Sequence, residues 1–254
     1  MKENRKIALI TGGSRGLGRD MALAVAAKGV SIILTYNSNR KEAEKAAEEI
    51  RIKGVQASVL QLNTADTSTL DSFVASVAAV LKSHFEGAKL DYLVNNAGIG
   101  INKPFTEVTM DDFDLVMNIH LKSVFFLTQK TLPFLNDNGA IVNVSTGLAR
   151  FSLPGHSVYA AMKGGVETLT RYQAKELGVR GIRVNVIAPG AIETDFGGGH
   201  VRDNADANKF VASQTALGRV GLPDDIGRVV AFLCSDEARW ITGQRLEVSG
   251  GMFL

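Results

Sequence analysis

The sequence predicts an α/β fold, in which a parallel seven-stranded sheet carries helices on both faces. Three observations favour this class: short apolar runs rich in β-branched residues, longer segments with helical spacing, and a regular alternation of the two along the chain. The chain has 254 residues, 45% of them hydrophobic, which is enough for one substantial core. No linker divides it, so we expect a single domain over residues 1–254.

Seven apolar runs of strand length are expected to form the sheet. In chain order they lie at residues 7–10, 30–34, 55–62, 90–94, 140–144, 182–187 and 246–248. Segments with helical spacing, such as residues 40–53 and 67–85, lie between them, so the order is βαβ and the sheet is expected to be parallel. Ligands of such sheets bind at the carboxyl ends of the strands.

The first predicted strand runs into a glycine-rich loop, which a helix follows. The loop occupies residues 12–18 (GGSRGLG), and the helical stretch continues through Lys28. Glycines let the backbone approach a pyrophosphate closely, while the free N–H groups and the positive dipole end of the next helix attract the anion. A flexible turn is the alternative, but the strand before the loop and the helix after it are the context that a nucleotide site requires.

Tyr159 and Lys163 are four residues apart on a predicted helix, so their side chains share one face. A free tyrosine has a pKa of about 10 and is a poor acid at neutral pH, unless a neighbouring cation stabilises its phenolate. Lys163 is placed to supply that cation. The pair predicts a proton donor suited to carbonyl chemistry, although the same spacing also occurs by chance in many helices.

Together these motifs resemble the short-chain dehydrogenase/reductase family. The glycine loop has the family spacing GxxxGxG, residues 95–98 (NNAG) follow the strand at 90–94, and further matches lie at residues 183–190 and 241–251. The resemblance covers nearly the whole chain and implies a Rossmann-type dinucleotide-binding fold. Residues 189–195 and 242–244 also suggest the 3-oxoacyl-carrier-protein reductase branch, but many other reductases share both segments.

The resemblance implies four catalytic residues: Asn118, Thr146, Tyr159 and Lys163. In the family a substrate-orienting serine usually lies thirteen residues before the tyrosine, and this chain has Thr146 there. Threonine keeps the hydroxyl that can donate to a carbonyl oxygen and adds a methyl group that narrows the pocket. The neighbouring Ser145 points to the other side of its strand and is expected to be structural. A helix kink or cap is the alternative role for Asn118.

The implied reaction is hydride transfer from a nicotinamide to a substrate carbonyl. Thr146 would polarise the carbonyl oxygen and Tyr159 would deliver the proton. Lys163 would lower the pKa of Tyr159 and hold the nicotinamide ribose, and Asn118 would help to anchor a water relay that refills the proton. In reverse, the same residues would oxidise an alcohol.

The lack of an acidic residue after the second predicted strand favours NADP(H) over NAD(H) as the cofactor. An acidic residue about 20 positions past the glycines would accept the ribose 2′-OH and repel a 2′-phosphate. Residues 35–40 contain no acid, and the nearest one, Glu42, lies inside the next helix. Arg15 can pair with a 2′-phosphate, with Asn37 and Ser38 as hydrogen-bond donors. The alternative is that Arg15 is only a solvated loop cation.

The expected cofactor contacts follow the carboxyl ends of the strands. Asn63 stands near the adenine, where many relatives have aspartate. The full expected set is Gly12, Ser14, Arg15, Gly16, Leu17, Gly18, Asn37, Ser38, Asn63, Thr64, Asn96, Ala97, Gly98, Tyr159, Lys163, Pro189, Gly190, Ile192 and Thr194.

A mobile lid over the substrate is expected at about residues 191–217, with a hinge at the glycines 197–199. Its polar residues do not specify a chemical class, so the substrate stays open. His156 lies in another expected pocket wall, where a surface loop histidine is the simpler interpretation. The four histidines are scattered without metal-ligand spacing, and no metal is expected.

Composition argues against several other classes. A net charge of +2 is too small to imply nucleic acid or an anionic membrane as a partner, and no apolar run reaches the length of about 18 residues that spans a bilayer. A cytoplasmic location is expected. Cys234 is the only cysteine, so no intrachain disulfide can form, and a buried structural thiol is expected.

The family resemblance also implies a homotetramer or homodimer, in which helices around residues 112–136 and 158–177 pair across one interface and the C-terminal strand and tail across another. The apolar residues there, Phe125, Phe126, Leu127 and Leu135, would equally fit the core of a monomer.

Other functions remain as alternatives. One is an NADP-sensing protein without catalysis, because a fold does not guarantee chemistry. Another is an NAD-dependent sugar or alcohol dehydrogenase of the same family. A hydrolase that uses Ser145 is disfavoured, because the chain lacks the GxSxG nucleophile elbow.

Overall fold

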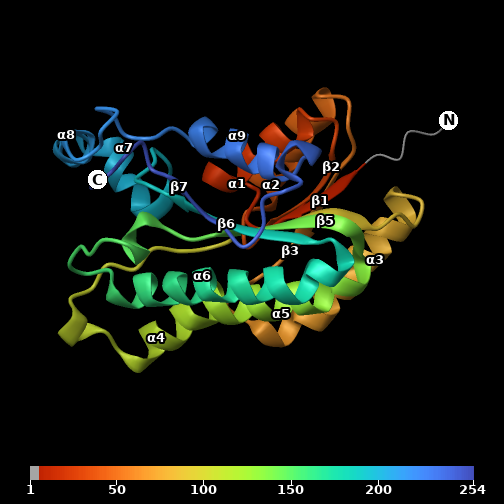
Figure 1. Cartoon of the computed structure of the whole chain (residues 1–254), viewed down its shortest axis with the longest axis horizontal. Helices are drawn as coiled ribbons and strands as arrows, with labels where there is room; N and C mark the ends of the chain where they lie inside the picture. Colours follow the sequence, from red (N-terminus) through yellow and green to blue (C-terminus); the bar gives the residue numbers. More distant parts are fainter. Residues whose placement is uncertain (1–5) are drawn as a thin grey trace.

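A seven-stranded parallel sheet forms the middle layer of the computed structural model, which describes residues 6–254 (Figure 1). Its strands are β1 (Ile7–Ile10), β2 (Ser31–Tyr36), β3 (Ala57–Gln61), β4 (Leu90–Asn95), β5 (Leu135–Val144), β6 (Arg183–Pro189) and β7 (Arg245–Val248). Their order across the sheet is β3-β2-β1-β4-β5-β6-β7, and every neighbouring pair is parallel. The predicted fold class is confirmed.

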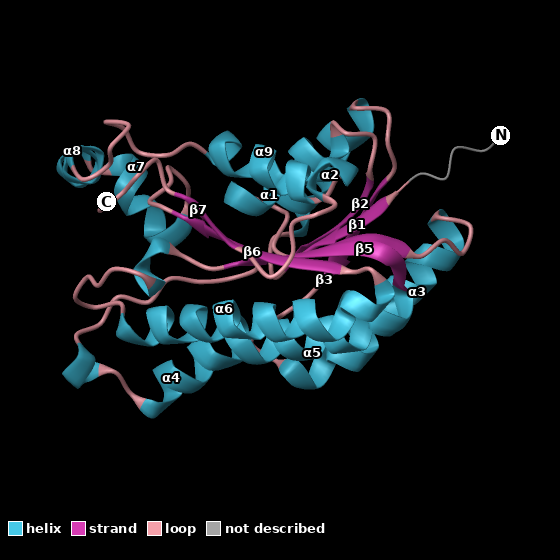
Figure 2. Ribbon diagram, viewed as in Figure 1, coloured by secondary structure: helices cyan, strands magenta, loops and turns pink. Residues whose placement is uncertain are grey.

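Helices cover both faces of the sheet (Figure 2). On one face lie α1 (Gly16–Ala26), α2 (Arg40–Ile52) and α9 (Pro223–Leu233). On the other lie α3 (Leu70–His84), α5 (Ser123–Thr131) and α6 (Ser157–Leu177), with α4 (Met110–Met117) at the end of this layer. The order of strands reverses at β1 and β4, which places a binding crevice at their carboxyl ends.

The side chains of each strand point alternately to the two faces of the sheet, and this produces two hydrophobic cores. In β1, Ala8 and Ile10 belong to the cluster beneath α1 and α9, whereas Ile7 and Leu9 belong to the cluster beneath α3 and α5. All four side chains are buried, because successive residues of a strand point to opposite faces and both faces are covered.

The helical region expected at residues 112–136 is interrupted. After α4, residues Asn118–Lys122 form a π-helical turn, η3, before α5 begins at Ser123. The helical part ends at Phe134, and β5 begins at Leu135, five residues earlier than expected. Its register against β4 shifts between Leu90 and Tyr92, which accommodates the extra residues.

Side-chain caps determine where several helices begin. Asn39 accepts a hydrogen bond from the Glu42 N–H at the start of α2, and Thr109 and Asp112 form a reciprocal capping box at the start of α4. Arg15 precedes α1 and provides no side-chain cap, and the first turn of α1 holds no acidic residue. The amino end of α1 therefore keeps its free N–H groups and positive dipole end.

The expected lid region lies beyond the carboxyl end of β6, close to the C-terminus (Figure 1). It contains a short turn, η7 (Phe196–Gly199), and the helices α7 (His200–Asp203) and α8 (Ala205–Ser213). The chain after α8 is bound to the C-terminal tail, since Leu217 N–H donates to the Gly250 carbonyl at 3.0 Å.

Within residues 6–254, no helix is both long and apolar enough to cross a membrane, and no three potential ligands cluster as they would around a metal ion. Cys234 is buried, and burial raises the pKa of its thiol to about 12.

Candidate active site

The glycine loop between β1 and α1 is tightly packed. Gly12 and Gly16 have positive φ angles of 66° and 54°, a conformation that glycine adopts without strain. A Cβ atom on Gly18 would lie 2.1 Å from the Gly12 carbonyl oxygen and 2.4 Å from the Asn96 Nδ2. The helix can therefore pack this closely against the loop only with glycine at position 18. The glycine loop therefore has the tight backbone conformation that its sequence predicts.

Thr11 ties this loop to the segment after β4. The Thr11 hydroxyl accepts hydrogen bonds from the N–H groups of Asn96 and Ala97, both at 3.0 Å, and the Asn96 amide donates to the Thr11 carbonyl at 2.9 Å. The carboxyl ends of β1 and β4, where the strand order reverses, are thereby fixed relative to each other. Sequence reasoning missed Thr11, although a threonine at the end of an apolar strand is a recognisable signal.

The residues expected to bind the adenosine end of the cofactor lie at the carboxyl ends of β2 and β3. Asn37 and Ser38 are exposed there, and the Asn63 side chain accepts a hydrogen bond from the Ala65 N–H at 3.1 Å. Arg15 is exposed on the glycine loop, and the ion pair next to it belongs to Arg19 and Glu49. Its guanidinium is available to an anion, and the end of β2 presents no carboxylate that would repel one.

Tyr159, Thr146 and Lys163 meet where α6 crosses the end of β5. The Thr146 side chain lies close enough to the Tyr159 phenol to influence its pKa. Lys163 is buried, and its Nζ donates to the Val144 carbonyl at 2.7 Å and lies 5.7 Å from the centroid of the Tyr159 ring. The structure therefore brings three of the four expected catalytic residues together.

Burial dominates the electrostatics of this group. Burial raises the pKa of Tyr159, and the neighbouring Thr146 side chain opposes the rise. Burial also lowers the pKa of Lys163, to about 7. Removal from water is the largest influence on both pKa values, and a lowering of the Tyr159 pKa by Lys163 stays a prediction.

The fourth expected residue, Asn118, lies where α4 passes into the π-helical turn η3. It is partly exposed at the start of the π-helical turn, and its side chain forms no hydrogen bond with any described residue. His120 lies against Tyr159, with ring centroids 5.1 Å apart and the rings at 89°. The catalytic role of Asn118 stays a prediction.

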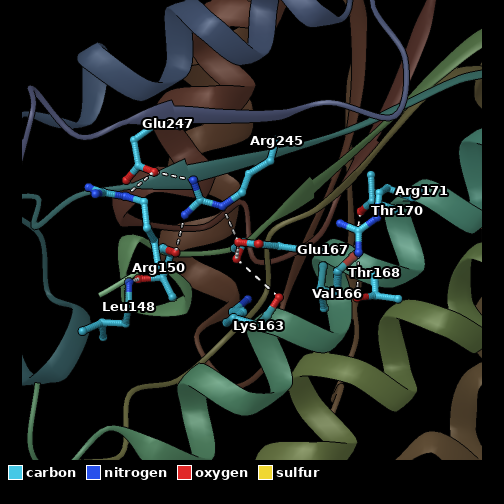
Figure 3. A network of polar contacts seen from close by, with 12 residues as sticks. Leu148, Arg150, Lys163, Val166, Glu167, Thr168, Thr170, Arg171, Arg245 and Glu247 are labelled. Carbon is cyan, nitrogen blue, oxygen red and sulfur yellow. Dashed lines mark hydrogen bonds and ion pairs between the residues drawn. The ribbon is translucent and has the colours of Figure 1, made fainter. Parts of the chain in front are cut away.

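A charged network links Arg245 and Glu247 of β7 with Glu167 of α6 (Figure 3). Arg245 of β7 donates to the Glu167 carboxylate at 2.6 Å and to the Thr146 carbonyl at 3.2 Å, and it also pairs with Glu247. Ser145 donates to the same Glu167 at 2.7 Å. Ser145 therefore has the structural role expected of it. The network joins α6 and β7 to the end of β5 through the Thr146 carbonyl.

The chain after β6 reaches across the site. Gly190 packs so closely on Ser249 that a Cβ there would lie 2.9 Å from the Ser249 Cα, and Thr194 lies next to Gly16 of the glycine loop. The Phe196 ring is 6.0 Å from the Tyr159 ring and half exposed. Residues 197–199 all have positive φ angles, which only glycine adopts readily. An aromatic side chain on a glycine-rich segment thus lies beside the phenol.

Comparisons with known proteins agree over nearly the full length. The model of a family described as enoyl-(acyl carrier protein) reductase matches residues 12–253. The 3-oxoacyl-[acyl-carrier-protein] reductase FabG of Staphylococcus aureus is 38% identical over 251 residues, covering 98% of each chain. The hydroxynaphthalene reductase-like protein Arp2 of Metarhizium brunneum is 37% identical over 257 residues, covering 97% of this chain and 94% of its own.

Solved structures of ketoreductases are also similar. The promiscuous reductase LugOII of lugdunomycin biosynthesis superposes with a TM-score of 0.93 at 34% identity, covering 98% of each chain. The landomycin C-6 ketoreductase LanV, solved with bound NADP and rabelomycin, has a TM-score of 0.89 at 34% identity, covering 98% of this chain and 96% of its own.

Proposed function

The chain belongs to the short-chain dehydrogenase/reductase family, and on that premise we propose that it is an NADP(H)-dependent ketoreductase that interconverts a ketone and a secondary alcohol. The observation that carries the proposal is the meeting of Tyr159, Thr146 and Lys163 at the end of β5, beside the crevice where the strand order reverses. A non-catalytic NADP-sensing protein gains no support from the named relatives, which are reductases.

The residues of this chain fit a dinucleotide phosphate. The close approach of Gly18 to Gly12, and the amino end of α1 that no side chain caps, form a cradle for the pyrophosphate. Arg15, Asn37 and Ser38 suit the 2′-phosphate because no carboxylate stands among them. NADP is bound in LanV and NADPH in a blue fluorescent protein that is 35% identical to this chain. NADP(H) is therefore the cofactor, and it supplies the hydride when bound.

Three side chains of this protein handle the substrate oxygen and its proton. The Thr146 hydroxyl donates to the carbonyl oxygen and orients it. Tyr159 donates its phenolic proton to that oxygen as negative charge develops there, which is why a phenol that stays protonated at neutral pH suits reduction. Lys163, when protonated, stabilises the phenolate that remains.

The substrate class follows from the relatives and from one side chain. A 3-oxoacyl thioester is the first candidate, because FabG acts on such a substrate. An aromatic or polycyclic ketone is the second candidate, and the half-exposed Phe196 ring beside Tyr159 favours it, since a flat substrate can stack on that ring. LanV was solved with rabelomycin, which makes both candidates worth testing together.

We propose in addition that residues 191–217 act as the substrate lid and that the protein assembles as a homotetramer. Three positive φ angles at residues 197–199 suit a hinge. Phe113, Phe125 and Phe126 are each more than a third exposed on α4 and α5, which suits burial against a second copy. Light scattering measures the assembly. A cytoplasmic location remains a prediction.

The deciding experiment follows NADPH oxidation by the wild type and by Tyr159→Phe with acetoacetyl thioesters, tetralones, quinones and ketosteroids. Tyr172→Phe is the matched control, because Tyr172 lies on the same helix but is exposed. We expect the wild type and the control to consume NADPH and Tyr159→Phe to lose at least about 100-fold in kcat. Full activity of Tyr159→Phe would exclude the proposed proton donor, and preference for NADH would exclude the cofactor.

A further inference from the structure

The end of the lid region pairs antiparallel with residues 250–253, which we call the C-terminal strap. The Phe253 N–H donates to the Gln214 carbonyl at 2.9 Å, and the Leu217 N–H donates to the Gly250 carbonyl at 3.0 Å. Gln214 and Leu217 directly follow α8, the longer helix of the lid. These backbone hydrogen bonds attach that end of the lid to the strap.

The lid and the strap also share a small hydrophobic core, separate from the two that flank the sheet. Val211 of α8 and Met252 of the strap are buried in it, and Phe151 and Phe253 pack against it. The rings of Phe151 and Phe253 lie 4.7 Å apart at 57°. Phe151 belongs to the wall of the site that follows β5, so this core brings together three segments that are far apart in the sequence.

Arg150 binds the strap through its backbone. Its Nη1 and Nη2 donate to the carbonyls of Phe253 and Met252, at 3.2 and 2.8 Å, and its Nε donates to the Glu247 carboxylate at 3.3 Å. Its guanidinium also lies 5.6 Å from the centroid of the Phe151 ring. A guanidinium carries its donors in a fixed, planar fork, so this one side chain binds two carbonyls and a carboxylate at once.

Glu247 connects this contact to the end of β5. The same carboxylate accepts from Arg245, which donates to the Thr146 carbonyl at 3.2 Å (Figure 3). Arg150, Glu247, Arg245 and Glu167 form a row in which positive and negative charges alternate. The strap that carries the lid is therefore linked, through two arginines and one glutamate, to the residue expected to orient the substrate oxygen.

We propose that Arg150 is a positioning residue, which fixes the substrate lid relative to Thr146 by way of the C-terminal strap. This inference rests on the proposed function. While the strap is bound, the lid keeps Phe196 beside Tyr159, with ring centroids 6.0 Å apart, where the substrate must fit. Release of the strap lowers the fraction of molecules whose lid is in place, and the apparent affinity for the ketone falls by that fraction. Arg150 itself takes no part in the transfer of hydride or proton.

Two variants separate the forked donors of Arg150 from its charge. Arg150→Met removes both while keeping a long side chain, and Arg150→Lys keeps the charge but not the fork. Arg171→Met is the matched control, because Arg171 is exposed on α6 and donates to Thr168 of the same helix at 3.0 Å.

For each variant the measurements are KM and kcat with a ketone that the wild type reduces, the Kd of NADPH, and Tm. A further measurement needs no substrate: the rate at which trypsin cuts after Lys209, which is exposed on α8. Mass spectrometry of the fragments identifies the cut. Proteolysis of this kind reports how often a helix leaves its folded position.

We expect Arg150→Met to raise KM at least about fivefold, while kcat and the Kd of NADPH change less than about twofold. Trypsin should cut after Lys209 at least about fivefold faster, because a released strap frees α8. Arg150→Lys should lie between Arg150→Met and the wild type, and Arg171→Met should match the wild type in every measurement.

Wild-type KM in Arg150→Met would overturn the proposal, whether or not the cleavage rate rises, because the strap would then not position the lid for the substrate. An equal loss of kcat, NADPH binding and Tm would also overturn it, since Arg150 would then support the whole fold. A wild type that binds NADPH but reduces no ketone would refute the proposed function instead. The trypsin measurement would still show whether Arg150 fixes the strap, so the two failures are distinguishable.

Discussion

Replacing Arg245 by Met should destabilise the fold and slow the reaction together. Arg245 bridges Glu167 of α6 and Glu247 of β7 and donates to the carbonyl of Thr146. Burial opposes its charge, but the carboxylates of Glu247 and Glu167 raise the pKa of the guanidinium above its ordinary value. The substitution therefore removes a full positive charge and leaves two partly buried carboxylates with fewer partners.

The size of the effect follows from how far these groups are removed from water. The side chains of Arg245, Glu167 and Glu247 are 22%, 14% and 25% exposed. Breaking a fully buried pair costs about 3–5 kcal/mol, whereas exposed pairs contribute about 0–1 kcal/mol. Because Ser145 still donates to Glu167 and Arg150 still pairs with Glu247, we expect a loss of about 2–3 kcal/mol. For a chain of this length that lowers Tm by about 4–10 °C.

Urea unfolding and thermal melting of Arg245→Met measure this loss, and Arg228→Met is the control. Arg228 pairs with Asp224 on the surface, where the side chains are 79% and 51% exposed, so its loss should cost less than about 0.5 kcal/mol. The kcat of Arg245→Met should also fall, since the end of β5 that carries Thr146 loses a donor. Equal stability of the two variants would refute the reasoning that burial makes the network strong.

Three further predictions concern the cradle, the lysine and the lid. Gly18→Ala would push a Cβ to 2.1 Å from the Gly12 carbonyl oxygen, so NADPH titration should show a loss of binding and Tm should fall; wild-type affinity would contradict this. Burial lowers the pKa of Lys163 to about 7, so between pH 7 and 9 the unfolded chain holds a proton that the folded chain has lost. The free energy of unfolding should then rise with pH by up to about 1.4 kcal/mol per unit, and in urea titrations Lys163→Met should lack this rise. Phe196→Ala should raise KM for a flat ketone while leaving the Kd of NADPH unchanged, because the ring lies beside Tyr159; an unchanged KM would remove Phe196 from the pocket wall.

Some features could be read from the sequence because they depend on residues close together in the chain. The glycine loop carries its backbone requirements within seven residues, and the spacing of Tyr159 and Lys163 fixes their common helix face. Apolar runs located all seven strands, and the absence of an acid at residues 35–40 predicted the cofactor. Each of these predictions depends only on local spacing or on the presence or absence of a charge in a short segment.

Tertiary structure decided what depends on distant partners and on burial. The π-helical turn at residues 118–122 carries His120, whose ring lies against Tyr159, and no periodicity in the sequence announces such a turn. Arg245 and Glu167 are 78 positions apart and meet only because β7 lies beside β6 and under α6. The pKa values of Tyr159 and Lys163 follow from their removal from water, which depends on the whole packed core and not on their neighbours in the chain.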